Sequence, residues 1–169
     1  EMSTLIGDLV ELSRDDSSRP SDKTLDLADV VRDAVARVRL RAGSIAFSVD
    51  LRPWYVYGDE RMLGRAVTNL LDNAAKYSPP HGTVHVTLRD GHLEVTDQGK
   101  GIADADLPHV FERFYRATEA RPLPGTGLGL AIVKATAVRH GGTVVAGRSS
   151  EGGATLTLTI PGSSSAPLT

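Results

Sequence analysis

The sequence between residues 59 and 77 predicts one long helix, and this helix constrains the fold more than any other stretch. Asp59 follows Gly58 and is a residue type that commonly caps a helix start, while Ser78-Pro79-Pro80 ends the helix. At about 100° per residue, one side of the helix gathers apolar side chains. They are Leu63, Val67, Leu70, Leu71 and Ala74. We therefore expect this side to face a hydrophobic core.

The opposite side of the same helix has an unusual set of polar groups. Asn69, Asn73, Lys76 and Tyr77 fall together there, because spacings of four, seven and eight residues return to one face. Amide oxygens are ligands for a hard cation, an ammonium group pairs with phosphate, and an aromatic ring stacks on a base. Taken alone, the helix favours the plainer interpretation of an amphipathic helix with an uncommon exposed face.

The remaining sequence patterns predict an α/β fold. Apolar residues recur with a helical period in residues 2–13, 25–41 and 127–140, and a short helical piece is expected at 107–115 within a long loop, 98–124. Strands are expected at residues 45–49, 54–57, 83–88, 92–97, 143–146 and 154–160. Together they predict a two-layer sandwich, in which helices cover one face of a mixed, largely antiparallel sheet.

Composition excludes several classes of function. The 19 basic and 21 acidic residues are nearly balanced, so neither nucleic-acid binding nor direct membrane contact is expected. No apolar run approaches the roughly 18 residues of a membrane span, and the absence of cysteine excludes disulfides and thiolate metal sites. The chain begins at Glu1 rather than methionine, which suggests an excised fragment.

Two glycine clusters point to a binding site once they are combined with the polar helix face. Residues 97–101 (DQGKG) follow a strand pattern and place the Asp97 carboxylate beside a flexible turn. Residues 125–130 (GTGLGL) precede a helix, whose free N–H groups favour an anion. Leu130 stands where a dinucleotide fingerprint would need its last glycine, and no GxxxxGK[ST] motif occurs. Either cluster alone is explained by a turn.

Four segments, in this order, resemble the motifs of one family. Residues 69–77 (NLLDNAAKY), 97–101 (DQGKG), 111–115 (FERFY) and 125–130 (GTGLGL) are similar to the N, G1, F and G2 boxes of the catalytic, ATP-binding domain of bacterial sensor histidine kinases. The resemblance covers roughly residues 25–161 and implies the Bergerat ATP-binding sandwich. It further implies that residues 1–16 end a dimerisation and phosphotransfer helix, that 17–24 form a linker, and that 162–169 form a flexible tail.

The resemblance also implies roles for individual residues in binding ATP and Mg²⁺. Asn69, Asn73 and Lys76 are the expected catalytic residues: Asn73 ligates Mg²⁺, Asn69 supports it through water, and Lys76 pairs with phosphate. Tyr77 is expected against the adenine, and Asp97 is expected to accept a hydrogen bond from its 6-amino group. The other expected nucleotide-contacting residues are Gly99, Gly101, Ile102, Phe111, Arg116, Gly125, Thr126, Gly127, Leu128, Gly129 and Leu130.

Two features depart from the family pattern. Ala154 follows Gly152-Gly153 where the family often has a threonine, so a hydroxyl contact is missing. No histidine lies in the phosphoacceptor context of the family, and we assign none of the five to catalysis. The resemblance implies as partners a histidine-bearing dimerisation domain of the same protein and a response regulator receiver domain. The parent protein is expected to be a homodimeric bacterial membrane protein with this domain in the cytoplasm.

Two other functions stay open at this point. An ATP hydrolase of the same superfamily usually has Glu at the position of Asn69, and a carboxamide cannot take a proton from water. A nucleotide-sensing module without catalysis is the second alternative. The segment 98–124 is predicted to be a lid that becomes ordered with nucleotide or partner, since loops of this length are usually functional or disordered.

Overall fold

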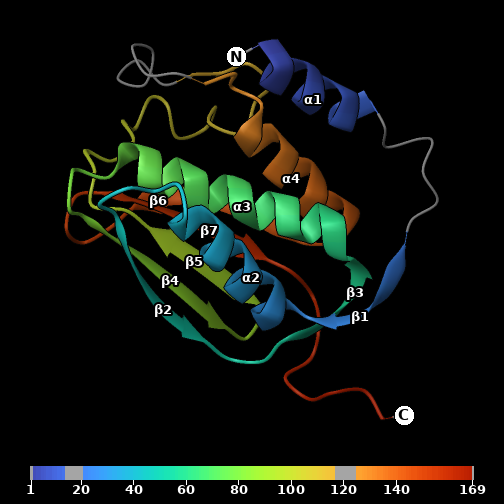
Figure 1. Cartoon of the computed structure of the whole chain (residues 1–169). Coiled ribbons are helices and arrows are strands. Elements are labelled where there is room, and N and C mark those ends of the chain that lie inside the picture. The colour runs from blue at the N-terminus through green and yellow to red at the C-terminus, as the bar shows by residue number, and fades with distance from the viewer. Residues whose placement is uncertain (1, 14–20, 117–124, 169) are drawn as a thin grey trace.

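The structure of the protein is a computed structural model, and it describes residues 2–13, 21–116 and 125–168 (Figure 1). The helices are α1 Met2–Ser13, α2 Leu27–Arg39, α3 Glu60–Tyr77 and α4 Gly129–Arg139. The strands are β1 Asp22–Asp26, β2 Ala46–Leu51, β3 Tyr55–Asp59, β4 Thr83–Arg89, β5 His92–Thr96, β6 Thr143–Arg148 and β7 Ala154–Thr159.

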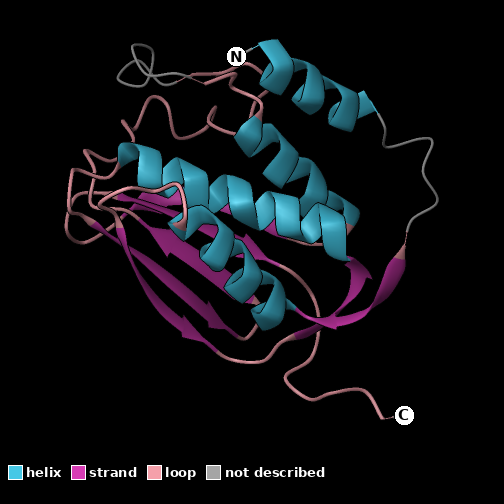
Figure 2. Ribbon diagram, in the orientation of Figure 1, coloured by secondary structure: helices cyan, strands magenta, loops and turns pink. Residues whose placement is uncertain are grey.

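The larger sheet has five strands in the order β2-β4-β5-β7-β6. Only β2 and β4 run parallel, and the other neighbouring pairs are antiparallel. Helices α2, α3 and α4 lie on one face of this sheet, as Figure 2 shows. The predicted two-layer sandwich with a mixed, largely antiparallel sheet is thereby confirmed.

Side chains on one face of the sheet pack against the helices and so join the two layers. In β4, Val84, Val86 and Leu88 are fully buried toward the helices, while the intervening side chains point to the other face. Helix α3 lies against both α2 and α4 and buries Leu63, Ala66, Val67, Leu70, Leu71 and Ala74. The Asp59 carboxylate caps this helix by accepting hydrogen bonds from the backbone of Arg61 and Met62, at 2.9 and 3.1 Å. The predicted core face and N-cap of α3 are both confirmed.

A second, two-stranded sheet was not predicted. Strand β1 pairs antiparallel with β3 and lies where the sequence suggested the end of a linker and the start of a helix. Helix α2 begins only at Leu27 because the Asp26 carboxylate caps it, accepting from Ala28 N at 2.9 Å. The same oxygen accepts from Trp54 N at 3.0 Å, which ties the helix start to the residue before β3.

One smaller expectation was wrong. Residues 107–115 form successive turns instead of a helical piece, and Phe114 has a positive φ of 62°. The tail is fixed at its start, because Ser163 and Tyr55 exchange backbone hydrogen bonds of 2.8 and 2.9 Å. The Trp54 indole N–H also donates to the Ile160 carbonyl at 2.8 Å.

Within the described ranges, no helix has both the length and the apolar character needed to cross a membrane.

Candidate functional site

Asp97 lies directly after β5 and is the most deeply buried acidic residue near the glycine clusters, at 3% exposure. Its Oδ1 accepts hydrogen bonds from Gly99 N at 2.9 Å and Ala154 N at 3.1 Å. Among the described residues, none hydrogen-bonds to Oδ2. Burial raises the pKa of this carboxyl, while the two backbone hydrogen bonds oppose the rise. One carboxylate oxygen is therefore fixed, and the other remains able to accept an N–H from a ligand.

Glycines surround Asp97 because no side chain fits there. A Cβ at Gly99 would collide with the Tyr77 carbonyl oxygen, and one at Gly153 would collide with the Asp97 carbonyl oxygen. Gly101 has a φ of 78°, and its Cβ would lie 2.6 Å from the Gly152 carbonyl oxygen. The chain after β5 and the chain before β7 are thus in direct backbone contact.

Gly153 and Ala154 were missing from the predicted site. Sequence reasoning treated Ala154 as the loss of a hydroxyl, whereas its backbone N–H orients Asp97. The signal for their role was the Gly152-Gly153 pair directly before a strand, which permits close backbone approach.

The polar face of α3 turns toward this region and toward the start of α4. The Asn69 side-chain amide donates to the Gly129 carbonyl at 3.2 Å, which fixes the first residue of α4 against α3. Asn73 is half-buried, and none of the described residues hydrogen-bonds to its side chain. Its amide is therefore available as an oxygen ligand.

Tyr77 connects the Asp97 region with the basic end of α3. Burial raises the pKa of the Tyr77 phenol, the charge of Arg116 lowers it and the charge of Asp97 raises it further. The Lys76 Nζ lies 5.3 Å from the centre of the Tyr77 ring. The tyrosine thus lies within electrostatic reach of both the acidic and the basic parts of the site.

Two cations converge at the first glycine of residues 125–129. A Cβ at Gly125 would lie 2.6 Å from Lys76 Nζ and 4.0 Å from Arg116 Nη2. Burial lowers the pKa of the Lys76 ammonium, and the charge of Arg116 lowers it further. The Arg116 charge disfavours the charged form of Lys76, and a bound anion would favour it.

The start of α4 adds uncapped backbone donors to the same place. Leu128 at the N-cap position makes no side-chain hydrogen bond to the helix, so among the described residues no capping side chain occupies the first N–H groups of α4, which can face an anion. Its own N–H donates to Thr126 Oγ1 at 3.2 Å. The Leu128 side chain is fully buried, and only its backbone can face a ligand.

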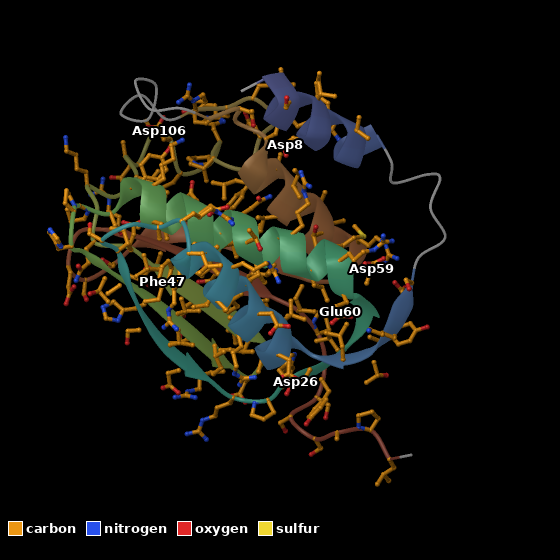
Figure 3. The ribbon with its side chains drawn as sticks, viewed as in Figure 1. Asp8, Asp26, Phe47, Asp59, Glu60 and Asp106 are labelled. Atoms are coloured by element: carbon orange, nitrogen blue, oxygen red, sulfur yellow. The ribbon has the colours of Figure 1, made fainter. Side chains whose placement is uncertain are left out.

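The loop after Gly101 is attached to residues 125–129 by its far end. Phe114 N donates to the Gly127 carbonyl at 2.9 Å, and a Cβ at Gly127 would lie 2.8 Å from Phe114 Cα. The Tyr115 hydroxyl donates to Asp106, a carboxylate only 7% exposed, which Figure 3 labels in this loop. These contacts fix the chain immediately before Arg116.

The remaining predicted contacts divide into two groups. Ile102, Phe111 and Leu130 are partly buried and pack against the core beside the site. Residues 117–124, the rest of the predicted lid, lie outside the described residues. The structure brings together the polar face of α3, the DQGKG turn and the glycines before α4, and these groups suit an aromatic base with an amino group and an attached polyphosphate.

Comparison with known proteins also indicates a nucleotide-binding domain. Residues 58–164 match the family model described as histidine kinase-, DNA gyrase B- and HSP90-like ATPase. The chain is 53% identical over 147 residues to the signal transduction histidine-protein kinase/phosphatase MprB of Mycolicibacterium paratuberculosis, covering 84% of this chain and 28% of that relative. It therefore spans less than a third of the length of this curated relative.

Solved structures extend the comparison. A mycobacterial sensor histidine kinase MprB structure superposes with a TM-score of 0.77 at 44% identity, covering 83% of this chain and 98% of that one. The full-length ShkA structure in complex with AMPPNP gives a TM-score of 0.73 at 25% identity, covering 95% and 36%. The chain belongs to the histidine kinase-, DNA gyrase B- and HSP90-like ATPase family, and within it to the ATP-binding catalytic domains of sensor histidine kinases.

Proposed function

We propose that this chain binds Mg-ATP across the described site and donates the γ-phosphate to a histidine on a separate domain. The observation that most strongly supports the proposal is the Asp97 carboxylate, which has one oxygen held by two backbone N–H groups and the other without a hydrogen bond from the described residues. An oxygen so placed accepts the adenine 6-amino group and disfavours the O6 acceptor of guanine.

The phosphate end of the nucleotide is assigned to the basic groups. Lys76 and Arg116 meet at Gly125, and the α4 N-terminus supplies backbone N–H donors beside them. Asn73, with Asn69 acting through water, would hold the Mg²⁺ ion, which neutralises charge on the phosphate oxygens when bound. A half-buried Asn73 amide without a hydrogen bond from the described residues fits that ligand role.

The same residues disfavour hydrolysis. The Asn69 carboxamide has no basic atom to take a proton from an attacking water, and its N–H is donated to Gly129. The chain's residues therefore bind and orient the triphosphate, while the nucleophile comes from elsewhere.

No histidine of this chain lies in the phosphoacceptor sequence of the family, and three of the five form hydrogen bonds within the domain. His140 accepts from Asp59 N through Nε2 at 3.1 Å, and its Nδ1 donates to the Thr136 carbonyl at 2.7 Å, so both ring nitrogens are engaged. The Nδ1 atoms of His92 and His109 contact Thr159 and Glu112, respectively. Transfer also needs the nucleophile about 3–3.5 Å from the phosphorus and in line with the leaving oxygen.

We further propose the protein context of this domain. The acceptor histidine belongs to a dimerisation domain of the same protein, which is a homodimer and passes the phosphoryl group to a response regulator receiver domain. The MprB relative is named as a signal transduction histidine-protein kinase/phosphatase, which supports this context. The same reasoning assigns the domain to the cytoplasmic side of a membrane sensor.

The test is incubation of the fragment with γ-labelled ATP and Mg²⁺, alone and with a histidine-bearing dimerisation domain from a related kinase. The fragment should stay unlabelled and release little free phosphate, while the added domain should gain acid-labile label. Rapid phosphate release by the fragment alone would instead indicate a hydrolase. Tight binding with no transfer to any supplied histidine domain would indicate a sensing module, and acid-labile label on the fragment would reveal a missed acceptor.

A further inference from the structure

Asp8 on α1 contacts two residues that are far from it in the sequence, Arg65 on α3 and Thr126 in the candidate nucleotide site. Its Oδ1 accepts from Arg65 Nη2 on α3 at 2.5 Å, and its Oδ2 accepts from Thr126 Oγ1 at 3.2 Å. The Asp8 side chain is 14% exposed, which is unusually low for an acidic residue on a surface helix. Figure 3 labels Asp8 on the α1 side that faces the rest of the molecule.

The Thr126 hydroxyl has a single hydrogen, and this limits what it can bind. Its oxygen accepts from Leu128 N, and its hydrogen is donated to Asp8. A hydroxyl has one donor, so the same hydrogen cannot also reach a phosphate oxygen. Asp8 and a bound phosphate therefore compete for Thr126.

Charge adds to this competition. Thr126 lies between Gly125, next to Lys76 Nζ, and the uncapped start of α4, which is the place assigned to the triphosphate. The Asp8 carboxylate is drawn to the same positive field, and a polyphosphate arriving there repels it. Arg65 contacts Asp8 from α3 and stabilises the docked position of α1 in the absence of that anion.

We propose that Asp8, Arg65 and Thr126 form a latch that docks α1 on the catalytic domain, and that triphosphate binding opens it. The proposal rests on the proposed function, because it requires the triphosphate at residues 125–129. Coupling between two binding events is reciprocal, so a triphosphate that weakens α1 docking is itself bound more weakly while α1 is docked. The position of α1 would then depend on whether the site holds ATP: docked without it and released with it.

The first measurement is calorimetry of Mg-ATP and of adenosine binding to the whole chain and to two variants. Asp8→Asn keeps the shape and removes the charge, and it should raise Mg-ATP affinity by roughly 5- to 10-fold, at the lower end of the usual range of allosteric coupling. Adenosine affinity should not change, because adenosine has no phosphate. Asp29→Asn is the matched control, since Asp29 on α2 is exposed and, among the described residues, pairs locally with Arg32.

The second measurement follows α1 directly. The chain has no cysteine, so Ser3→Cys on α1 and Lys134→Cys on α4, both exposed, can be spin-labelled selectively. The distance distribution should become longer and broader with Mg²⁺ and a non-hydrolysable ATP analogue, remain unchanged with adenosine, and be long already in Asp8→Asn.

The outcomes separate the latch from the proposed function. Absence of Mg-ATP binding to the unmodified chain would overturn both. Normal Mg-ATP binding, with Asp8→Asn equal to or weaker than the unmodified chain and the label distances independent of nucleotide, would overturn the latch alone and leave Asp8 as a static anchor.

Discussion

Replacement of Asp97 by asparagine separates binding from folding, because the two oxygens of this carboxylate have different environments. Oδ1 accepts two backbone N–H groups, and Oδ2 is assigned to the adenine amino group. An asparagine that keeps its oxygen toward Gly99 and Ala154 presents an NH₂ group to another NH₂ group. The flipped amide instead opposes both backbone donors, so either orientation loses hydrogen bonds.

The expected loss of ATP-binding free energy follows from the negative charge of the Asp97 carboxylate that the substitution removes. Hydrogen bonds to a charged group contribute about 1.5–3 kcal/mol, and the loss of one should weaken ATP binding by about 1–3 kcal/mol. At about 1.4 kcal/mol per factor of ten, the dissociation constant should rise roughly 5- to 150-fold. Discrimination against GTP should fall as well, because an asparagine NH₂ can donate to the guanine O6 atom.

Asp97→Asn should weaken ATP binding but should not lower the free energy of unfolding. Burial raises the pKa of Asp97 in the folded state, so its stabilising contribution is complete only below the unfolded-state pKa and is lost as pH rises through the folded pKa. At pH 7 the ionised carboxylate therefore opposes folding, and Asp97→Asn should leave the free energy of unfolding unchanged or higher.

Calorimetry with Mg-ATP and Mg-GTP, together with urea unfolding, measures both effects. Asp104→Asn is the control, since Asp104 lies in the same loop and its side chain is 86% exposed. An Asp97→Asn variant that binds ATP as tightly as the unmodified chain would refute the adenine assignment.

Three further predictions concern the surroundings of the site. Tyr115→Phe removes the hydroxyl that donates to Asp106 and so loosens the chain before Arg116; Mg-ATP binding should weaken several-fold, and adenosine binding should not change. Tyr57→Phe, at an exposed tyrosine, should change neither. Gly153→Ala should lower the free energy of unfolding by about 1–3 kcal/mol in urea titration, because its Cβ overpacks the Asp97 backbone, while Gly147→Ala meets nothing within 4 Å and should be neutral. Lys76→Met should weaken ATP more than adenosine in calorimetry, and equal losses would contradict a phosphate contact.

The sequence was sufficient where the signal is local. The periodicity of α3 placed Leu63 and Leu70 in the core and Asn69 and Asn73 on the other side, and the structure agrees. The Asp97 turn was also recognisable, because a carboxylate and two glycines follow an alternating strand.

Structure that depends on distant contacts was not predictable. Strand β1 (DKTLD) has no alternation of apolar residues and is extended because β3 pairs with it. A short helical piece was expected at residues 107–115, yet Phe114 is in a left-handed conformation that allows its N–H to reach Gly127.

The role of His140 illustrates the same limit. It was assigned no catalytic role and no contact was predicted for it from the sequence, whereas its ring joins the end of α4 to Asp59 at the start of α3. A Cβ at Gly58 would collide with this ring, which explains a glycine before the helix cap. Both facts require knowledge of which distant segments lie side by side.

A crystal structure with Mg²⁺ and a non-hydrolysable ATP analogue tests the central claim most directly. The account predicts that the adenine 6-amino group donates to Asp97 Oδ2, with the phosphates against Lys76, Arg116 and the first turn of α4. A base bound away from Asp97, or phosphates that contact neither basic residue nor the α4 start, would contradict it.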